Sequence, residues 1–457
     1  MNKSNLLVGL DIGTTSVKAV VADTTSNELR IIGAANEPTV GMRHGKIVDI
    51  DETAASISRV VNKVAQKTNS KIYRVVTGIP VGLLQLENAT GLINIGEEGQ
   101  EVGDNDVKRV LSSAIGAALK DGRQAISFLP SKFLIDGKTD VDDPRKMIAH
   151  SLEVHGILLT APTADLHNIR KAVERAGYQN NFFIPTPLAI SSIALDEGER
   201  TFGSILLDLG GGTTTATVIH ENKIKYATID LEGGIDITND ISTVLNTSKK
   251  EAEKVKIEFG YADPELTSSE NQFPVKVVGE TSGKMIDEEY LSEIINARVE
   301  QILSRIGKGL ADHDAFNLPG GVVITGGTSA LQGMGDVVKN NFRVKTKIFQ
   351  PNQMGLRNPI YTAGFGIVQY AYDLDDIDYL VNSVIYGEEN TPIVQEIEKP
   401  NRENMKFFKR PTSSSEIEPK EDYNKNTVSS SFEDEQENIK KTKKENKVRD
   451  FFKKFFD

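Results

Sequence analysis

Apolar residues in the first part of the chain follow two rhythms, one typical of strands and one typical of a helix. Alternating or continuous apolar runs predict strands at residues 6–23, 29–36, 45–49 and 73–78. Residues 50–68 instead carry apolar side chains at helical spacing, and Asp51 is the expected N-cap of this helix. We therefore predict a first α/β core domain over residues 1–83.

Residues 84–163 have a different pattern, and we predict that they form an inserted domain. A helix begins near Asp104, and strand patterns cover residues 124–135 and 151–161. These elements are sufficient for a small core of their own. The first core domain is expected to resume in residues 164–195 and 355–385.

The second half of the chain returns to the strand-and-helix order of the beginning. We assign residues 196–226 and 307–354 to a second core domain, and residues 227–306 to a smaller subdomain. The smaller subdomain is predicted to contain helices at residues 233–245 and 249–259, a strand at 273–278 and a long helix from Asp287.

The end of the chain is read as a linker followed by an amphipathic helix. Residues 386–440 lack apolar periodicity and are predicted to be disordered. In residues 441–457, helical spacing gathers one apolar stripe, formed by Val448, Phe451, Phe452, Phe455 and Phe456. Residues 440–457 carry a net charge of +5, whereas the whole chain carries −12. A basic, Phe-rich helix favours an anionic membrane surface; the alternative is docking on a partner protein or on the body of this chain.

Composition narrows the class of protein. The chain contains no Cys, which excludes a disulfide scaffold and thiolate metal sites and fits a reducing compartment. Its start lacks the features of a signal peptide, and no apolar run is long enough to span a bilayer. The acidic body argues against nucleic acid as a partner.

One motif, Asp-x-Gly, occurs twice where a predicted strand turns into another strand. The first copy is followed by threonines and a lysine, and its candidate residues are Asp11, Gly13, Thr14, Thr15 and Lys18. The second copy has a longer glycine run, and its candidate residues are Asp208, Gly210, Gly211, Gly212, Thr213 and Thr214. Two copies so far apart indicate two halves of a fold that face each other across a phosphate.

The residue types in both copies suit a polyphosphate. Glycines allow backbone N–H groups to approach phosphate closely, and threonine hydroxyls and Lys18 can add donors. Asp11 and Asp208 would repel phosphate, but they can hold Mg²⁺ through its water ligands. A third glycine-rich element, Gly326, Gly327 and Thr328, follows a predicted buried strand and can lie against an adenine or ribose.

The two turns, the third glycine-rich element, the inserted domain and the terminal helix together resemble the actin-like ATPase superfamily. Within it they resemble the FtsA family of bacterial cell-division proteins. The resemblance covers the chain up to about residue 380. It implies an α/β, actin-like two-lobed fold with an FtsA-type inserted domain, a disordered linker and a terminal amphipathic helix. It also implies ATP as the ligand, with Glu253 and Lys256 reaching its ribose and adenine and Gly234 lying near it.

The resemblance further implies a role in division. Members of the family tether filaments of the tubulin-like protein FtsZ to the inner face of the membrane, polymerise, and recruit later division proteins to the septum. The chain is therefore expected to be a peripheral protein on the cytoplasmic side of the cell membrane. Arg298 matches the family's arginine for the C-terminal peptide of FtsZ; alternatively it is a solvated helix residue.

The catalytic residues cannot be assigned from the sequence. Many actin-like ATPases have a Glu before the Pro that opens the helix after the first half, where it can orient water. Here Thr186 precedes Pro187, so we expect ATP binding with at most slow hydrolysis. Two other functions stay open: an actin-like scaffold of a pilus or other envelope machine, and a small-molecule kinase of the same superfamily.

Overall fold

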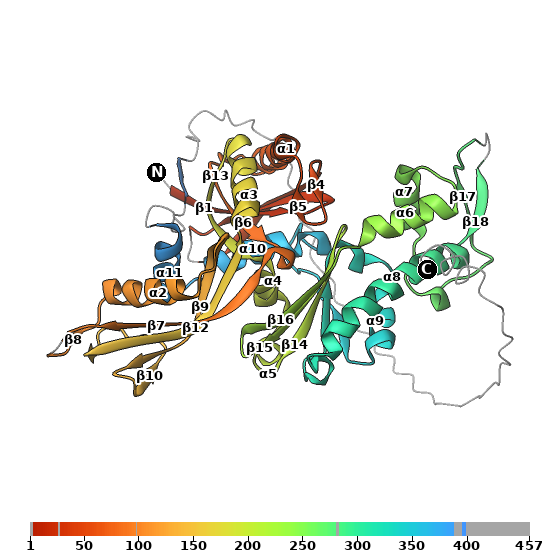
Figure 1. Ribbon diagram of the computed structural model, residues 1–457. Helices are drawn as coiled ribbons and strands as arrows, with labels where there is room; N and C mark the ends of the chain where they lie inside the picture. Colours follow the sequence, from red (N-terminus) through yellow and green to blue (C-terminus); the bar gives the residue numbers. More distant parts are fainter. Residues whose placement is uncertain (1–2, 26–27, 97, 280–282, 388–394, 399–457) are drawn as a thin grey trace, which may run out of the picture. The chain divides into compact units, whose positions relative to one another are not determined.

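Figure 1 shows the computed structural model, which describes residues 3–25, 28–96, 98–279, 283–387 and 395–398. The fold belongs to one compact unit, residues 1–398. The predicted linker beyond residue 398 and the predicted terminal helix, with Val448, Phe451, Phe452, Phe455 and Phe456, lie outside the described residues.

The first central sheet combines an antiparallel meander with two parallel strands. In spatial order its strands are β13 (Gln179–Pro185), β6 (Arg74–Ile79), β1 (Lys3–Ile12), β2 (Ser16–Asp23) and β3 (Arg30–Pro38). Strands β1, β2 and β3 are antiparallel neighbours, whereas β6 runs parallel to β1 and β13 parallel to β6. The turn between β1 and β2 is the first Asp-x-Gly motif.

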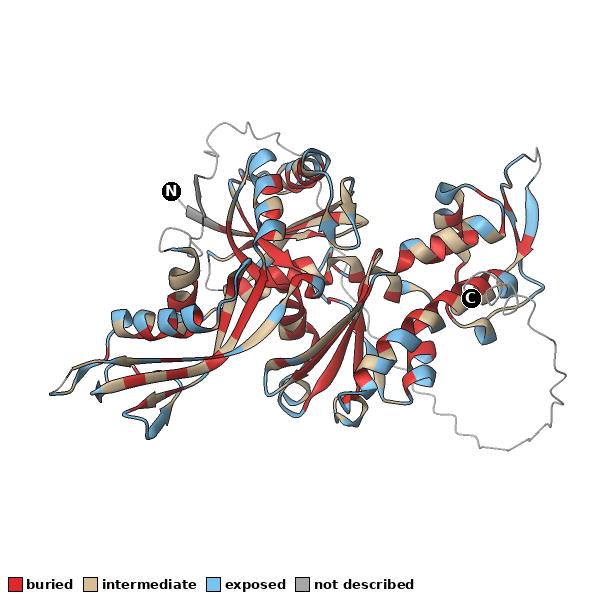
Figure 2. Ribbon diagram, viewed as in Figure 1, coloured by how far each residue is buried: buried red, intermediate tan, exposed pale blue. Residues whose placement is uncertain are grey.

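Helices cover both faces of this sheet. Successive side chains of a strand point to opposite faces, so each strand contributes to two cores. On β2, Val17, Ala19 and Val21 pack in one core with helices α1 (Ile50–Thr68) and α3 (Thr163–Arg175). The alternate residues Val20 and Ala22 pack instead on α10 (Thr362–Tyr372). Both faces are therefore buried, and Figure 2 shows this part of the fold as largely buried ribbon.

The second central sheet repeats the strand order of the first. Its strands are β20 (Thr346–Ile348), β19 (Val322–Thr325), β14 (Ser204–Leu209), β15 (Thr214–His220) and β16 (Lys223–Asp230). Strands β14, β15 and β16 form the antiparallel meander, and β19 and β20 are the parallel strands. The turn between β14 and β15 is the second Asp-x-Gly motif, so the two copies occupy equivalent places in two similar sheets.

Four helices share one core with the second sheet. They are α6 (Gly234–Val244), α7 (Lys249–Phe259), α8 (Glu288–Ala311) and α9 (Met334–Phe342). On the opposite face, Leu206 and Val323 pack on α4 (Thr186–Ala194), which follows directly from β13 of the first sheet. Helix α5 (Glu197–Phe202) and the hairpin of β17 (Gln272–Val275) and β18 (Lys284–Asp287) complete the second half.

Residues 84–163 form a third sheet with its own core. In spatial order its strands are β10 (Thr139–Val141), β9 (Arg123–Ile135), β12 (Ser151–Pro162) and β7 (Gln85–Asn94). A separate short pair is formed by β8 (Gln100–Glu101) and β11 (Ile148–Ala149). Helix α2 (Asp104–Ala118) packs on this sheet beside α11 (Asp376–Tyr386), whose Leu380 and Val381 enter the same core. Helix α11 follows α10 late in the sequence, so its packing joins the inserted unit to the body of the fold.

The remaining elements are short. Strands β4 (Met42–Arg43) and β5 (Lys46–Ile47) form a small hairpin before α1. The 3-10 helices are η1 (Val81–Leu83), η2 (Pro264–Leu266), η3 (Ala315–Asn317), η4 (Gly327–Ala330) and η5 (Pro359–Tyr361).

Several sequence predictions need correction. The N-cap of α1 is Asp49, whose side chain accepts the Glu52 amide, while Asp51 lies in the first turn. The strand expected at residues 45–49 is only β5 of the small hairpin. Tyr386, assigned to the linker, ends α11 and its hydroxyl donates to the Ile126 carbonyl over 2.6 Å. Part of the linker, β21 (Gln395–Glu398), is paired antiparallel to the start of β1.

Candidate nucleotide site between two hairpin turns

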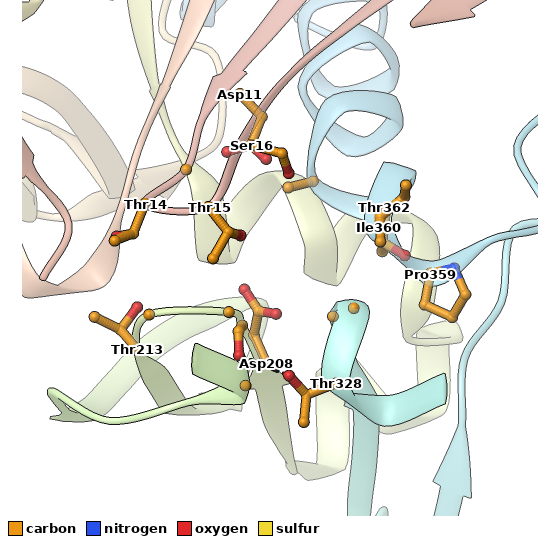
Figure 3. A pocket seen from close by; sticks show the side chains of 18 of the residues that line it. Asp11, Thr14, Thr15, Ser16, Asp208, Thr213, Thr328, Pro359, Ile360 and Thr362 are labelled. Atoms are coloured by element: carbon orange, nitrogen blue, oxygen red, sulfur yellow. Dashed lines mark hydrogen bonds between the residues drawn. The ribbon is translucent and has the colours of Figure 1, made fainter. Parts of the chain in front are cut away.

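The two Asp-x-Gly turns meet across a cavity. Figure 3 shows Asp11, Thr14, Thr15 and Ser16 on one side of it, with Asp208 and Thr213 on the other. We call residues 13–15 the first turn and residues 210–213 the second turn. Each turn follows a strand that is buried on both faces, so the turns are held at the ends of rigid elements.

The second turn approaches the first so closely that only glycine fits at two positions. A Cβ atom added at Gly211 would lie 2.4 Å from the Thr15 Oγ1 atom, and one added at Gly212 would lie 2.6 Å from the Thr14 Cβ atom. Any larger residue would push the turns apart. The glycine run predicted from the sequence to admit phosphate therefore also allows the two halves to close.

The cavity has a volume of about 850 Å³, within the usual range for small-molecule and cofactor sites. It brings together nearly all of the candidate ligand residues. Those that line it are Asp11, Gly13, Thr14, Thr15, Lys18, Asp208, Gly210, Gly211, Gly212, Thr213, Gly234, Glu253, Lys256, Gly326, Gly327 and Thr328.

Thr214 is the one candidate that the cavity does not include. It is the first residue of β15, is buried, and its hydroxyl donates to the Glu232 carbonyl over 3.0 Å. Neighbouring residues of a strand face opposite ways, and on β15 it is Thr215 and Thr217 that line the cavity, so Thr214 faces away from it. The expectation that Thr214 donates to phosphate is not supported by this geometry.

The two aspartates differ in their electrostatic surroundings. The Nζ atom of Lys18 lies 3.1 Å from the Asp11 Oδ2 atom, in an ion pair across the β1–β2 register. Burial, reinforced by the negative charge of Asp11 and opposed by Lys18, raises the pKa of Asp208 to about 6. The negative charge of Asp208 is therefore less well balanced by a neighbouring cation than that of Asp11. A cation bound beside Asp208 would favour its charged form.

The third glycine-rich element packs directly behind Asp208. Gly326 has a φ of +92°, and a Cβ atom there would lie 2.3 Å from the Asp208 Oδ1 atom. The Thr328 hydroxyl donates to the Gly210 carbonyl over 2.8 Å. This element therefore helps to shape the second turn as well as lining the cavity.

Lys256 and Glu253 lie at the wall of the cavity formed by α7. The Lys256 ammonium donates to the Gly234 carbonyl and to the Thr238 hydroxyl, each over 2.8 Å, and pairs with Glu253 over 2.8 Å. Burial lowers the pKa of Lys256, although Glu253 opposes this effect. Both side chains are tied to the start of α6, so they fix the position of Gly234 in the wall.

Sequence reasoning missed one wall of the cavity, the turn before α10. Figure 3 shows Pro359, Ile360 and Thr362 there, beside Thr328. A Cβ atom on Gly327 would lie 3.0 Å from the Ile360 Cγ2 atom, so the two loops are in contact. The local signal was the Asn358-Pro359 pair just ahead of an apolar helix, because the Asn358 side chain caps η5.

The donor set fits a nucleoside triphosphate with Mg²⁺. Glycine turns, threonine hydroxyls and Lys18 supply donors for phosphate. Among the described residues, no group of three or more His, Cys, Asp or Glu side chains could hold a metal ion alone. Asp11 and Asp208 would hold Mg²⁺ together with water and phosphate oxygens, as this ion usually requires.

Thr186 lies in the wall of the cavity at the start of α4 and is buried. A Cβ atom on the neighbouring Gly78 would lie 2.8 Å from its Oγ1 atom. The carboxylates among the described lining residues are those of Asp11, Asp208, Glu253 and Glu258. The position before Pro187 therefore presents a hydroxyl to the cavity, where many actin-like ATPases present a carboxylate.

Arg298 lies on α8 and does not line the cavity, and its surroundings differ from both sequence interpretations. It is only 5% exposed, so it is not a solvated residue. Its guanidinium donates to both carboxylate oxygens of Asp240, over 2.6 and 2.8 Å, and to Glu232 over 2.8 Å. A direct ion pair with an acidic peptide would require Arg298 to release these partners, so the geometry does not favour that role.

The described residues carry no helix that is long and apolar enough to cross a bilayer.

Comparisons with known proteins agree with the fold and the motifs. Residues 205–366 match the family described as cell division protein FtsA, and residues 82–160 match the SHS2 domain inserted in FtsA. Among solved structures, a PilM–PilN type IV pilus biogenesis complex covers 80% of this chain and 99% of its own, with a TM-score of 0.57 and 14% identity. The MamK double helical filament matches with a TM-score of 0.50 and 13% identity, covering 81% of this chain and 99% of its own. These likenesses support the actin-like fold.

Relatives of known family are much more similar in sequence. The cell division protein FtsA of Enterococcus hirae is 43% identical over 401 residues, covering 87% of this chain and 91% of the relative. That of Enterococcus faecalis is 42% identical and covers 90% and 96%, and that of Bacillus subtilis is 36% identical and covers 81% and 84%. The chain therefore belongs to the FtsA family of cell division proteins, with an actin-like fold and an inserted SHS2 domain.

Proposed function

We propose that this protein is an ATP-dependent tether, which binds Mg-ATP between the two turns and links FtsZ filaments to the cytoplasmic membrane. The observation that carries the nucleotide part is the pairing of two glycine turns across one cavity, each preceded by an aspartate. Bound Mg²⁺ would neutralise phosphate charge there. Lys18, the threonine hydroxyls and the glycine amides would hold the phosphates, and Gly326, Gly327 and Lys256 would contact the nucleoside.

We propose that hydrolysis is slow. Thr186 stands where a carboxylate would orient water, and a neutral hydroxyl is a poor general base at neutral pH. Nucleotide occupancy would then act mainly by holding the two halves of the fold together. A rate of phosphate release comparable to that of fast actin-like ATPases, measured on lipid vesicles, would refute this part.

The membrane part of the proposal rests on the sequence of residues 441–457. Its apolar stripe of Val448 and four phenylalanines lies on a strongly basic segment, which favours the interface of an anionic bilayer. Membership of a family of cell division proteins is consistent with such a tether at the septum. The protein would then also form filaments with copies of itself and recruit later division proteins.

The C-terminal peptide of FtsZ is the proposed partner of the small subdomain. Because Arg298 is buried and hydrogen-bonded to Asp240, we expect exposed residues of that subdomain to make most of the direct contacts with the peptide. Pull-down of the full chain with the FtsZ peptide tests this part directly. A scaffold of a pilus machine would leave the peptide in solution.

Sedimentation with anionic liposomes tests the membrane part. We expect binding by the full chain and its loss in Phe451→Ser/Phe455→Ser. The matched control is Phe407→Ser/Phe408→Ser, which removes the same two side chains from a basic segment of the linker and should leave binding intact. Equal binding by both double variants would contradict the proposed anchor. A small-molecule kinase would have no need of liposome binding.

A further inference from the structure

Residues 230–234, which we call the strap, run from the end of β16 to the start of α6 along the back of the second turn. The Thr214 hydroxyl donates to the strap carbonyl of Glu232 over 3.0 Å. The amide of Gly234, the last residue of the strap, donates to the Gly210 carbonyl over 3.1 Å, and that of Ile235, the next residue, to the Gly211 carbonyl over 2.7 Å. The second turn is therefore hydrogen-bonded to the strap and the residue after it at two successive peptides.

These bonds fix the direction of the turn's amides. In a trans peptide the carbonyl and the following N–H point in opposite directions. Since the carbonyls of Gly210 and Gly211 accept from Gly234 and Ile235, the amides of Gly211 and Gly212 are turned the other way. Those amides are the natural donors of a glycine turn to an anion.

The strap is held on its other side by two arginines of α8. The Arg305 guanidinium donates to Asp230, with its Nε atom 2.5 Å from Oδ2, and also to Glu232. Arg298 donates to the same Glu232 carboxylate over 2.8 Å while it binds Asp240. Asp230 and Arg298 are both buried, so these pairs are less screened by solvent than surface salt bridges.

The strap also contacts the opposite half of the fold. The His44 Nδ1 atom, at the tip of the β4–β5 hairpin, lies 2.9 Å from the Leu231 carbonyl oxygen. The same hairpin contacts the first turn, because the Gly45 amide donates to the Thr14 hydroxyl over 2.9 Å. A displacement of the strap would therefore affect both turns.

We propose that Arg298 and Arg305 are positioning residues of the nucleotide site, which hold the strap and thereby orient the second turn for the phosphates of a nucleoside triphosphate. The inference rests on the proposed binding of ATP in this cavity. Neither arginine lines the cavity. They act through Glu232 and Asp230, and they make α8 sensitive to the state of the second turn.

The decisive variant is Arg305→Gln, since Arg305 is partly exposed, although the buried Asp230 loses its arginine partner and the variant will be somewhat less stable. The matched control is Lys308→Gln, which removes the same charge from the same helix. In the full chain with Mg²⁺, we expect Arg305→Gln to weaken ATP binding roughly tenfold, and Lys308→Gln to change it less than about twofold. Arg305→Lys should recover part of the loss, because it keeps the positive charge but cannot reproduce the guanidinium contacts with both Asp230 and Glu232.

A second measurement separates positioning from general loss of stability. Amide hydrogen exchange at Gly234 and Ile235 should become faster in Arg305→Gln than in Lys308→Gln, because these amides bond to the second turn. The proposal requires both changes, and either one without the other overturns it. If the unaltered chain binds no ATP, the proposed function fails, and the exchange rates alone then report whether Arg305 holds the strap.

Arg298→Gln provides a further check. It should weaken ATP binding at least as much as Arg305→Gln, although the unpaired buried Asp240 will also lower stability. If Arg298→Gln folds and binds ATP normally while losing the FtsZ peptide, the residue serves the partner directly and its assignment here is wrong. If it does not fold, Arg305→Gln still decides the proposal.

Discussion

The two hairpin turns have the same motif and the same place in similar sheets, but they differ in charge and in support. Asp11, which precedes the first turn, is paired with Lys18 on the adjacent strand. Among the described residues Asp208 has no such ion pair, and its pKa is raised, while hydrogen bonds from the strap, from Ile235 and from the Thr328 hydroxyl hold the backbone of the second turn. The comparison indicates that the two turns have different roles. The first turn has a cation of the chain, Lys18, beside its aspartate. The second has a hydrogen-bonded backbone, and its aspartate is suited to binding an added cation.

The largest effect is expected when the first turn loses its cation. Lys18→Met would leave Asp11 and Asp208 facing each other and remove a phosphate donor, so we expect ATP affinity to fall about 100-fold or more. Equilibrium titration of the full chain measures this. The matched control is Lys63→Met, because Lys63 also pairs with a carboxylate, Glu37 at 2.5 Å, but does not line the cavity. Equal losses in both variants would contradict the special role of Lys18.

The next largest effect concerns closure of the turns. Gly211→Ala places a methyl group against Thr15, and overpacking of this kind costs about 1–3 kcal/mol of unfolding free energy. Urea unfolding would show it. Adding Thr15→Ala removes the obstructing atoms and should restore part of the loss. Gly13→Ala should cost less, since its nearest atoms are at 3.0 and 3.1 Å and one ends the flexible Lys18 side chain.

A smaller effect is expected from pH. Asp208 has a native pKa of about 6 against an ordinary value of 3.8. The native state therefore retains a proton that the unfolded chain releases, and the contribution of Asp208 to stability falls as pH rises from about 4 to about 6. Mg²⁺ competes with this proton, so Mg²⁺-dependent ATP affinity should rise about tenfold between about pH 5 and 7.

Asp208→Asn is the control for the pH prediction. It should remove the rise in affinity with pH and lower Mg²⁺ dependence, and it should flatten the stability difference between acidic and neutral pH. If the variant and the unaltered chain showed parallel pH profiles, another group would be responsible.

The smallest effect tests the link from the first turn to the β4–β5 hairpin. Thr14→Val deletes the hydroxyl that accepts the Gly45 amide, which should cost about 1 kcal/mol of unfolding free energy. Thr14→Ser keeps the hydroxyl and should retain most of the stability. A loss in Thr14→Ser equal to that in Thr14→Val would mean that the methyl group, and not the hydrogen bond, matters.

The sequence predicted the site best where local chain geometry requires a particular residue. The glycine runs were recognisable because few other structures need them, and helix α1 was predicted with its observed bounds because its apolar spacing is regular. The misplacement of Thr214 was avoidable, since strand alternation separates it from Thr215 and Thr217, which line the cavity. Glu253 and Lys256 were found through the family resemblance alone.

Other errors arose where distant segments meet. Arg298 was expected to contact an acidic peptide or solvent, because its acidic partners within the chain lie 58 and 66 residues away in the sequence. The wall formed by Pro359 and Ile360 precedes α10, which packs on α4 and on strands β1, β2 and β6. Helix α11 was overlooked because its apolar face packs on the inserted domain, which lies more than 200 residues earlier. Such contacts depend on tertiary structure, which periodicity does not encode.

The antiparallel pairing of β21 with β1 has a mechanical consequence. Glu398 pairs with Lys3 and Gln395 with Leu6, so the chain leaves β21 at the end of β1 farthest from Asp11. A pull on the chain beyond Glu398 that is directed along the strand axis, away from Asp11, would load the bonds between the two strands in shear and not break them one by one. The load would pass along β1 to the residue that precedes the first turn, so tension at the C-terminal end of the chain would be felt at the cavity.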